Sequence, residues 1–428
     1  MTHPTPGPVE DLPPFPFPGS SHRGPAPLFA RLRAERPVVR VQWAGGGHAW
    51  LVTRHRDVRA VLDDPRFSRA AAYAPGAPRF SGLFQAPPGM IISLDPPDHT
   101  RLRALAEQAF SAARIAAMRP RVRELAAGLL DALEKQAGQG PVDLVAGFAA
   151  PLAMTVICEL LGVPEADREQ FHVWVRQFAD VSGPPERAAE GGERLGAYIA
   201  RLVGERRGGV AEDGEPTSAQ GRRGADDVLS ALAAARIGED RLGFDELVGL
   251  GFTLLGAGFD SSAGQLGNVV ATLLAGHRDV WRRLGEHPGD IPAVVEELLR
   301  TVNLNGNDTS GLPRIATEDV TVGGVVIPAG DAVFLAFASA NRDEDVFPHA
   351  DRTDFHRAGN PHLAFGHGIH RCLGAPLARL ELSVALAELT RRFPDAALAV
   401  PEEDLRWRAG DVNHNLLALP VRLTRSTA

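Results

Sequence analysis

Apolar positions recur at helical spacing through most of the chain. The segments 100–110 and 151–163 place apolar residues three or four positions apart, which is the spacing of one buried helix face. The same pattern predicts a long helix from Asp245 to about Ala275 and a shorter one over 291–301. Helices therefore make up most of the expected structure.

Strand patterns are confined to short stretches near the two ends of the sequence. Alternating apolar residues between Val38 and Val52 flank three glycines at 45–47, which predicts a β-hairpin. Further short strands are expected over 320–326 and 333–335. We therefore expect a mainly α fold, a large helical domain with small β-sheets.

Two segments carry neither pattern. Residues 1–25 are rich in proline and are expected to form an extended N-terminal arm. Residues 204–227 are polar and rich in glycine, which predicts a flexible surface loop.

Composition narrows the class of protein. The 428 residues carry a net charge of −8, whereas nucleic-acid-binding proteins need a basic surface. The chain lacks a run of 18 apolar residues, and its proline-rich start does not resemble a signal peptide or a membrane anchor. The only cysteines, Cys158 and Cys372, fit a reducing compartment without disulfides. We expect a cytoplasmic protein with no nucleic-acid or membrane partner.

Cys372 stands between a glycine-containing loop and the start of a predicted helix whose apolar face includes Leu377 and Leu380. The unpaired N–H groups of a helix start favour a thiolate over a thiol. Two other interpretations are open from the residues alone. Cys372 could be a small buried apolar residue, or it could join His367 and His370 in a zinc site.

The whole segment around Cys372 resembles the haem-binding loop of the cytochrome P-450 family. Its FGxGxHxCxG pattern is matched by Phe365, Gly366, Gly368, His370, Cys372 and Gly374. The resemblance implies that Cys372 is the axial ligand of the iron in haem b (iron protoporphyrin IX). It also implies that His370 contacts a haem propionate and that Phe365 packs beside the thiolate.

The long helix contains six interior glycines, each costing about 1 kcal/mol relative to alanine. Close packing against another helix and close approach of a planar cofactor both explain them. Within this helix, residues 257–261 resemble the AGx[DE]T oxygen-activation motif of the family, with serine in place of threonine. By resemblance, Ala257 and Gly258 face the haem, while Asp260 and Ser261 relay protons.

Other residues match family positions in the expected order. Glu297 and Arg300, three residues apart, together with Arg352 resemble the structural triad of the family. The resemblance assigns them to folding and not to chemistry.

Basic residues match the propionate-binding positions of the family. His99 and Arg103 lie one helical turn apart, so they can hold one anionic group. Alone they would indicate a surface ion pair, but their segment resembles the family's DPPxHxxxR motif. Arg314 matches another propionate-binding arginine. The resemblance spans nearly the whole chain and implies one cytochrome P-450 domain over residues 1–428.

The resemblance also implies a reaction and its partners. We expect a monooxygenase that oxidises a small natural product, with electrons from a ferredoxin and a ferredoxin reductase, and a monomeric enzyme. Exposed Arg371 is a candidate docking residue. The polar segments 303–311 and 413–415 suggest a peptide, cyclic dipeptide or macrolide substrate, although they also fit capped turns. Oxidative coupling without oxygen insertion and a non-catalytic haem sensor are the alternatives.

Overall fold

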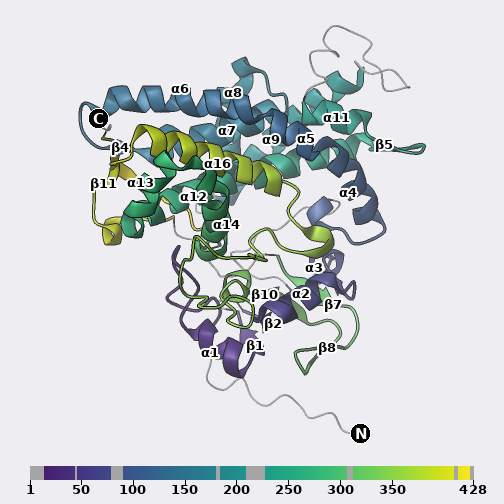
Figure 1. Cartoon of the computed structure of the whole chain (residues 1–428). Coiled ribbons are helices and arrows are strands. Elements are labelled where there is room, and N and C mark those ends of the chain that lie inside the picture. Colours follow the sequence, from purple (N-terminus) through teal and green to yellow (C-terminus); the bar gives the residue numbers. More distant parts are fainter. Residues whose placement is uncertain are drawn as a thin grey trace.

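The computed structural model describes residues 14–43, 46–78, 90–179, 184–208, 227–305, 312–408 and 413–424. A wide body of helices narrows toward a β-rich end that holds the first helix and the N-terminal side of the chain (Figure 1). Within the described residues, none of the helices combines the length and the apolar character needed to cross a bilayer.

The helices follow the predicted pattern closely. The α-helices are α1 (Leu28–Glu35), α2 (His55–Asp63), α3 (Ala70–Tyr73), α4 (Asp98–Ala109), α5 (Ala112–Ala117), α6 (Arg119–Ala137), α7 (Ala150–Leu160), α8 (Arg168–Ala179), α9 (Pro185–Gly208), α11 (Val228–Ala234), α12 (Phe244–Gly276), α13 (Arg278–Glu286), α14 (Ile291–Thr301), α15 (Phe337–Ala340) and α16 (Ala375–Arg392). Short 3₁₀ or π turns are η1 (Ile91–Ser93), η2 (Val145–Ala149), η3 (Glu165–Asp167), η4 (Pro288–Asp290), η5 (Gly368–His370) and η6 (Glu402–Asp404).

The strands form small sheets, as expected. They are β1 (Val38–Gln42), β2 (His48–Val52), β3 (Phe67–Ser68), β4 (Val142–Asp143), β5 (Arg236–Ile237), β6 (Asp240–Arg241), β7 (Arg314–Ala316), β8 (Val320–Val322), β9 (Val325–Ile327), β10 (Ala332–Leu335), β11 (Ala397–Leu398) and β12 (Pro420–Arg422). The largest sheet has the order β1-β2-β10-β7-β3, in which only β2 and β10 are parallel. The predicted hairpin is confirmed, because Val38 pairs with Val52.

The long helix α12 runs through the middle of the helical body (Figure 1). It begins where the Glu246 side chain accepts a hydrogen bond from the Gly243 N–H at 2.7 Å, which supplies one of the partners that a helix start lacks. Apolar residues occupy almost all of its faces, as expected for a helix surrounded by protein. Residues of α12 and α16 line one cavity together with Phe365 of the loop that precedes Cys372.

Two of the expected irregular segments differ in part from the structure. Residues 204–208 belong to α9, so the polar loop expected over 204–227 starts later, and 209–226 lie outside the described residues. The described part of the N-terminal arm is packed against the sheet. Phe15 is fully buried against Trp43, and its N–H donates to Gln42 O at 2.7 Å.

Candidate functional site

The loop before α16 is shaped by two glycines. The Cys372 N–H donates to Phe365 O at 2.8 Å, which closes the loop on itself. Gly366 and Gly368 have φ values of 70° and 69°, a region that residues with a side chain rarely adopt. A Cβ on Gly368 would also lie 2.6 Å from Leu62 O, so α2 leaves no space for one. These glycines place the thiol at the start of α16.

The surroundings of the Cys372 thiol act in opposite directions. Cys372 is exposed as a residue, but desolvation of its sulfur by the surrounding loop raises the pKa, while the N–H groups of Gly374 and Ala375 and the charge of Arg103 lower it. The helix start alone therefore does not make a thiolate, although a bound metal cation would deprotonate the thiol outright. A Cβ on Gly374 would lie 3.9 Å from the Cys372 sulfur, so the backbone here stays close to the thiol.

The zinc interpretation has no support. Within the described ranges, no group of three or more His, Cys, Asp or Glu side chains could hold a metal ion. His367 points elsewhere, because its Nε2 lies 3.1 Å from the Asp63 carboxylate. Cys158 is buried in α7, and burial raises its pKa to about 12, as expected of an inert thiol. A metal ion bound by Cys372 therefore needs a further ligand that supplies its remaining donor atoms, as a porphyrin does.

Basic side chains from α4 and from the Cys372 loop meet at the start of α16. His99 of α4 and His370 of η5 have ring centroids 4.1 Å apart. His99 Nδ1 and His370 Nε2 are buried and have no hydrogen-bond partner among the described residues. Arg103 completes the group, since its Nη1 donates to Arg371 O at 2.7 Å. The structure thus brings together the basic residues that the sequence singled out.

Burial and neighbouring cations together lower the pKa values in this group. Burial, followed by the charge of Arg69, lowers the pKa of His370 to about 2. The same two causes lower the pKa of buried Arg314 to about 9. A bound anion would stabilise both groups. It would accept a hydrogen bond from the buried imidazole nitrogen, and its charge would offset the cost of burying the arginine. The two carboxylates of haem b fit this cluster.

Arg69 and Tyr73 of the α3 region belong to the same cluster, and the sequence analysis missed them. Arg69 is 4% exposed and donates to Ile92 O at 3.0 and 2.7 Å. Tyr73 Oη is buried and has no partner within the described chain. An arginine next to a buried strand, in the segment FSRAAAY, was the available signal.

The AGFDS segment lies in the middle of α12. The Ser261 hydroxyl donates to Ala257 O at 2.5 Å, so both residues lie on one face of the helix. Gly258 differs from the expectation that it faces the haem, because a Cβ there would lie 3.0 Å from Ile157 Cδ1 of α7. At Gly258 the close-packing explanation fits the geometry, and Ala257 is the residue beside Ser261.

The carboxylate of Asp260 is held by the C-terminal segment. Asn415 Nδ2 and Asn413 Nδ2 donate to its Oδ2 at 2.7 and 2.9 Å, and Arg408 Nη1 donates to Oδ1 at 3.3 Å. Asn268 of α12 adds a bond to His414 O at 2.7 Å. The polar residues at 413–415 therefore have partners within the protein, and their polarity is no argument for a polar substrate. Residues 306–311 lie outside the described residues.

The predicted triad is correct in two of its three members. Arg300 makes two bonds to the Glu297 carboxylate, at 2.9 and 2.7 Å, and both side chains are buried. Arg352 is exposed and contributes only its carbonyl, which accepts from Arg300 Nη2 at 2.8 Å. The third side chain is Arg357, whose Nε lies 3.2 Å from Glu297 Oε2. The motif places an arginine in this loop, but only the fold shows which of the two is buried.

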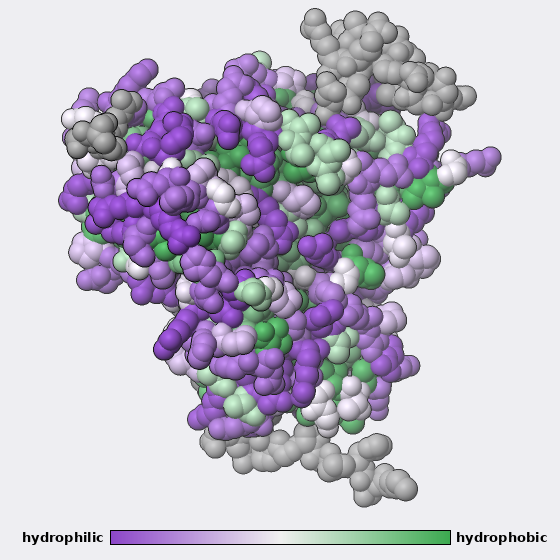
Figure 2. Space-filling model, viewed as in Figure 1, coloured by the Kyte–Doolittle hydropathy of each residue, from purple (hydrophilic) through white to green (hydrophobic). Residues whose placement is uncertain are grey.

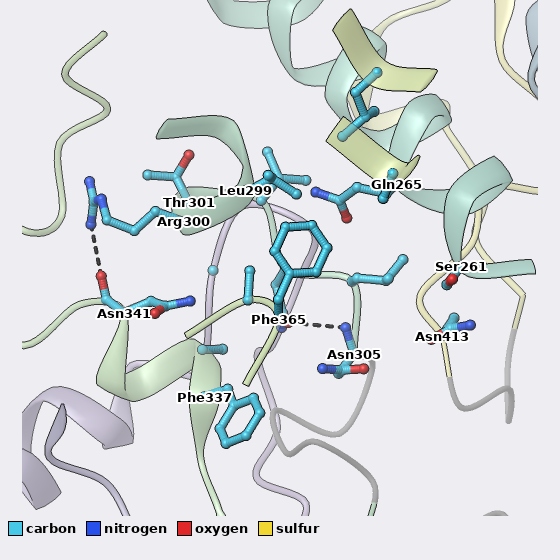
Figure 3. Close-up of a pocket in the computed structure, with 18 of the residues that line it drawn as sticks. Ser261, Gln265, Leu299, Arg300, Thr301, Asn305, Phe337, Asn341, Phe365 and Asn413 are labelled. Carbon is cyan, nitrogen blue, oxygen red and sulfur yellow. Dashed lines mark hydrogen bonds between the residues drawn. The ribbon is translucent and has the colours of Figure 1, made fainter. Parts of the chain in front are cut away.

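Two cavities adjoin α12. One, of about 220 Å³, is lined by Ser261, Gln265, Phe365, Glu381 and Asn413 (Figure 3). The other, of about 880 Å³, lies among η1, α4, α8, α9 and the first half of α12. Phe178 lines the larger cavity, and its ring would lie 3.8 Å from a Cβ on Gly256, directly before Ala257. The larger cavity therefore extends along α12 toward Gly256.

Comparison with known proteins supports this geometry. The cytochrome P-450 family model matches residues 291–401. Nocardicin C N-oxygenase from Nocardia uniformis subsp. tsuyamanensis is 44% identical over 92% of this chain and 94% of its own length. Mycinamicin IV hydroxylase/epoxidase from Micromonospora griseorubida is 44% identical over the same shares. The LnmA cytochrome P-450 hydroxylase of Streptomyces atroolivaceus superimposes with a TM-score of 0.85, at 43% identity, over 96% of this chain and 100% of its own.

These relatives match the chain over nearly all of its length, and they are named as hydroxylases, epoxidases and oxygenases. The enzyme class therefore follows from the comparisons, and the cluster of basic groups beside Cys372 accounts for the cofactor. The chain belongs to the cytochrome P-450 family and is a monooxygenase that uses haem b, takes electrons from a redox partner and oxidises a small molecule.

Proposed function

We propose that Cys372 is the axial ligand of the iron and that the surrounding basic groups bind the haem propionates. The observation that carries this proposal is the meeting of His99 and His370 next to the Cys372 loop, because each has a buried ring nitrogen that lacks a partner in the described chain. Buried Arg314 lies close enough to His370 to lower its pKa. Arg103 adds a positive charge to the group. When bound, the haem would activate dioxygen, with the thiolate donating electron density to the iron.

Other residues of the loop shape the site around the thiol. Phe365 lines the smaller cavity and lies under Arg379, whose guanidinium carbon is 4.5 Å from the ring centroid. Gly366 and Gly374 keep side chains away from the space beside the thiol. Glu297, Arg300 and Arg357 hold the loop 350–360 against α14 and take no part in chemistry.

Ser261 is the proposed proton-handling group on α12. Its hydroxyl donates to Ala257 O, so its lone pairs remain free to accept a hydrogen bond. A serine lacks the methyl group that restrains a threonine rotamer, so this hydroxyl turns more easily than that of the usual motif. The hydrogen bond to Ala257 O offsets this freedom, because it fixes the position of the Ser261 hydroxyl in the resting protein.

The substrate proposed from the cavity is a bulky natural product such as a macrolide. Apolar side chains, including Leu102, Phe178 and Phe252, line the 880 Å³ cavity together with the carboxylates of Glu193 and Asp245. Such a wall suits a large, mainly apolar molecule with several polar groups. The name of the mycinamicin IV hydroxylase/epoxidase, a relative over 92% of the chain, points to the same class.

The electron donors proposed are a ferredoxin and a ferredoxin reductase, and the enzyme is expected to act as a monomer. Arg371 is exposed on the loop next to the thiol, close to where an electron would enter. The exposed Ile369, two residues earlier, adds an apolar contact to this edge.

The decisive test is spectroscopic. The reduced protein with carbon monoxide is expected to show the red-shifted Soret band of thiolate ligation, and Cys372→Ser is expected to lose that band. The matched control Cys158→Ser keeps it, because Cys158 is buried in α7 away from the loop. A wild-type protein without the band would overturn the proposal.

Labelled dioxygen then separates the reaction outcomes. Heavy oxygen in the product marks insertion of an oxygen atom, whereas a coupled product without heavy oxygen marks the alternative reaction. The non-catalytic sensor has no support from the relatives, which are named for turnover.

A further inference from the structure

Two consecutive glutamates of α14 face different parts of the protein. Glu297 is the buried carboxylate of the structural triad, and it holds the loop 350–360. Consecutive residues of a helix point about 100° apart, so Glu296 faces another direction. Its carboxylate meets α16 and the segment that leads to Cys372. Glu296 therefore has partners of its own, outside the triad.

Arg379 of α16 forms a bidentate ion pair with Glu296. Its Nε and Nη2 donate to Oε1 and Oε2 at 2.6 and 2.8 Å, a geometry that fixes the plane of the guanidinium. The Arg379 and Glu296 side chains are 30% and 32% exposed. An ion pair that is this exposed to solvent adds little to the free energy of unfolding, so stability alone does not account for it.

His362 holds the same carboxylate from the side of the loop. The Ala364 N–H donates to His362 Nδ1 at 3.2 Å, which assigns the ring proton to Nε2. Nε2 donates to Glu296 Oε2 at 3.0 Å, and the His362 side chain is 2% exposed. Burial raises the pKa of Glu296, but the hydrogen bonds from Arg379 and His362 outweigh it and hold the pKa at about 2. Glu296 is therefore a carboxylate at neutral pH.

The guanidinium of Arg379 lies over the ring of Phe365. Its carbon is 4.5 Å from the ring centroid, within the range of a cation–π contact. Phe365 O accepts a hydrogen bond from the Cys372 N–H at 2.8 Å. Phe365 also lines the 220 Å³ cavity, and Figure 3 shows its ring among the residues of that cavity. One cation thus touches the residue whose backbone is bonded to the proposed iron ligand.

A cation over an aromatic ring changes what the ring presents to its other neighbours. The ring has a negative face and a positive edge, and a cation draws electron density toward the face that it covers. The rest of the ring becomes more positive, and positive surroundings favour the state of a nearby group that holds one more electron. The charges and hydrogen bonds around an axial ligand are among the means by which a protein sets the potential of a haem iron.

We propose that Arg379 raises the reduction potential of the bound haem through the Phe365 ring, and that Glu296 and His362 hold Arg379 in place and limit the effect of its charge. The inference rests on the proposed ligation of the iron by Cys372. Arg379 is a positioning residue. It accepts no electron and transfers no proton, and the electrons still come from the external donor.

Spectroelectrochemical titration of the substrate-free, haem-loaded enzyme measures the potential. Arg379→Leu removes the cation and leaves the Glu296 carboxylate without it, so the equilibrium is expected to shift toward the ferric form by about threefold to tenfold, the range of one cation–π contact. A tenfold shift corresponds to about 59 mV for one electron. Arg391→Leu is the matched control and should keep the wild-type potential, because Arg391 pairs with Glu388 near the other end of α16.

Glu296→Gln tests the sign of the effect. The amide keeps the size of the side chain and an acceptor for Arg379, but it removes the negative charge that balances the cation. The potential is therefore expected to rise, in the direction opposite to Arg379→Leu. A structural loosening of the loop would move the potential of both variants in the same direction.

A double-mutant cycle tests whether Phe365 carries the effect. Phe365→Leu keeps an apolar side chain and removes the ring. In the Phe365→Leu background, Arg379→Leu is expected to change the potential by less than about half of its effect in the wild-type background, because residues that act through one another are not additive. An equal shift with and without the ring would mean that Phe365 takes no part.

Each outcome decides the proposal. An unchanged or raised potential in Arg379→Leu overturns it, as does an unchanged or lowered one in Glu296→Gln, or an equal shift with and without the Phe365 ring. If Arg379→Leu fails to bind haem, Glu296→Gln in the two backgrounds decides. The carbon monoxide band reports the proposed iron ligand separately, so a protein that shows the band but fails these tests loses only the assignment of Arg379.

Discussion

At the scale of single residues, three buried or half-buried carboxyl groups of one chain differ in the hydrogen-bond donors that surround them. Glu297 is buried and accepts from two arginines, from the Asp354 N–H at 2.7 Å and from Asn360 Nδ2 at 3.1 Å. Asp260 is fixed by one arginine and two amides, and Glu381 has no partner among the described residues. Residue type alone does not predict these differences, because each depends on the number of donors around the carboxyl group.

The triad gives a matched pair of substitutions. Arg357→Ala removes a cation from a buried carboxylate and is expected to lower the free energy of unfolding by on the order of 3 kcal/mol. Arg352→Ala removes an exposed side chain and leaves the backbone carbonyl that accepts from Arg300. The free energy of unfolding should therefore change by no more than about 0.5 kcal/mol.

Denaturant unfolding of the haem-loaded proteins, with the haem spectrum recorded alongside, compares the two variants. If the free energy of unfolding falls equally in both variants, or falls more in Arg352→Ala, the assignment of Arg357 as the third member of the triad is contradicted.

At the scale of elements, the glycines of α12 fall into groups according to what lies next to them. A Cβ on Gly251 would lie 2.9 Å from Ile199 Cγ2 of α9, and one on Gly264 would lie 1.7 Å from Asn415 Oδ1. Around Gly249 there is nothing within 4 Å. The close-packing explanation therefore holds at Gly251 and Gly264, whereas Gly249 borders the larger cavity, and the close approach of a cofactor stays a prediction.

This difference predicts opposite effects of the same substitution. Gly249→Ala is expected to raise the free energy of unfolding by about 0.5–1 kcal/mol, because alanine favours the helix and meets no neighbour. Gly264→Ala is expected to lower it by about 1–3 kcal/mol, because the new methyl group must displace Asn415 from Asp260.

Thermal or denaturant unfolding measures both. A stabilised Gly264→Ala protein would contradict the packing of the C-terminal segment against α12, on which the hydrogen bond from Asn415 to Asp260 depends.

At the scale of the whole molecule, the site is assembled from segments far apart in the chain. Arg69 follows β3, His99 starts α4, Arg314 opens β7 and His370 precedes α16, so more than half of the chain separates the first from the last. The face that carries α16 and α4 is mainly hydrophilic, with apolar residues in separate patches (Figure 2). Such a surface favours a partner bound through charge. The expectation of one domain over 1–428 stays a prediction.

The docking proposal makes a prediction at this scale. Arg371→Glu is expected to slow the reduction of the haem by a ferredoxin by about tenfold at low ionic strength, with the difference shrinking as salt screens the charges. Arg31→Glu on α1 is the control, because Arg31 is exposed and α1 lies at the narrow end of the molecule (Figure 1).

Stopped-flow reduction with equal haem content in both variants makes the comparison. An unchanged rate in Arg371→Glu at every salt concentration would remove Arg371 from the docking surface.

The periodic spacing of apolar residues in the sequence predicted much of the observed fold. The helix predicted from Asp245 to about Ala275 is Phe244–Gly276, and the one predicted over 291–301 has those bounds. Local spacing predicts such elements because one buried face repeats along a helix or strand. The start of the polar loop at 204 was wrong, because α9 continues to Gly208, and Arg206 and Arg207 of this last turn donate to Gly162 O and Leu242 O.

The sequence by itself determined the periodic helices, the family motif around Cys372 and the basic residues at motif positions, because these are local features that spacing along the chain records. The tertiary structure alone decided that Arg357 replaces Arg352 at Glu297, that Arg69 joins the basic cluster, and that Asp260 is held while Glu381 is not. Those outcomes depend on burial and on partners from distant segments, and neither is written in the order of residues.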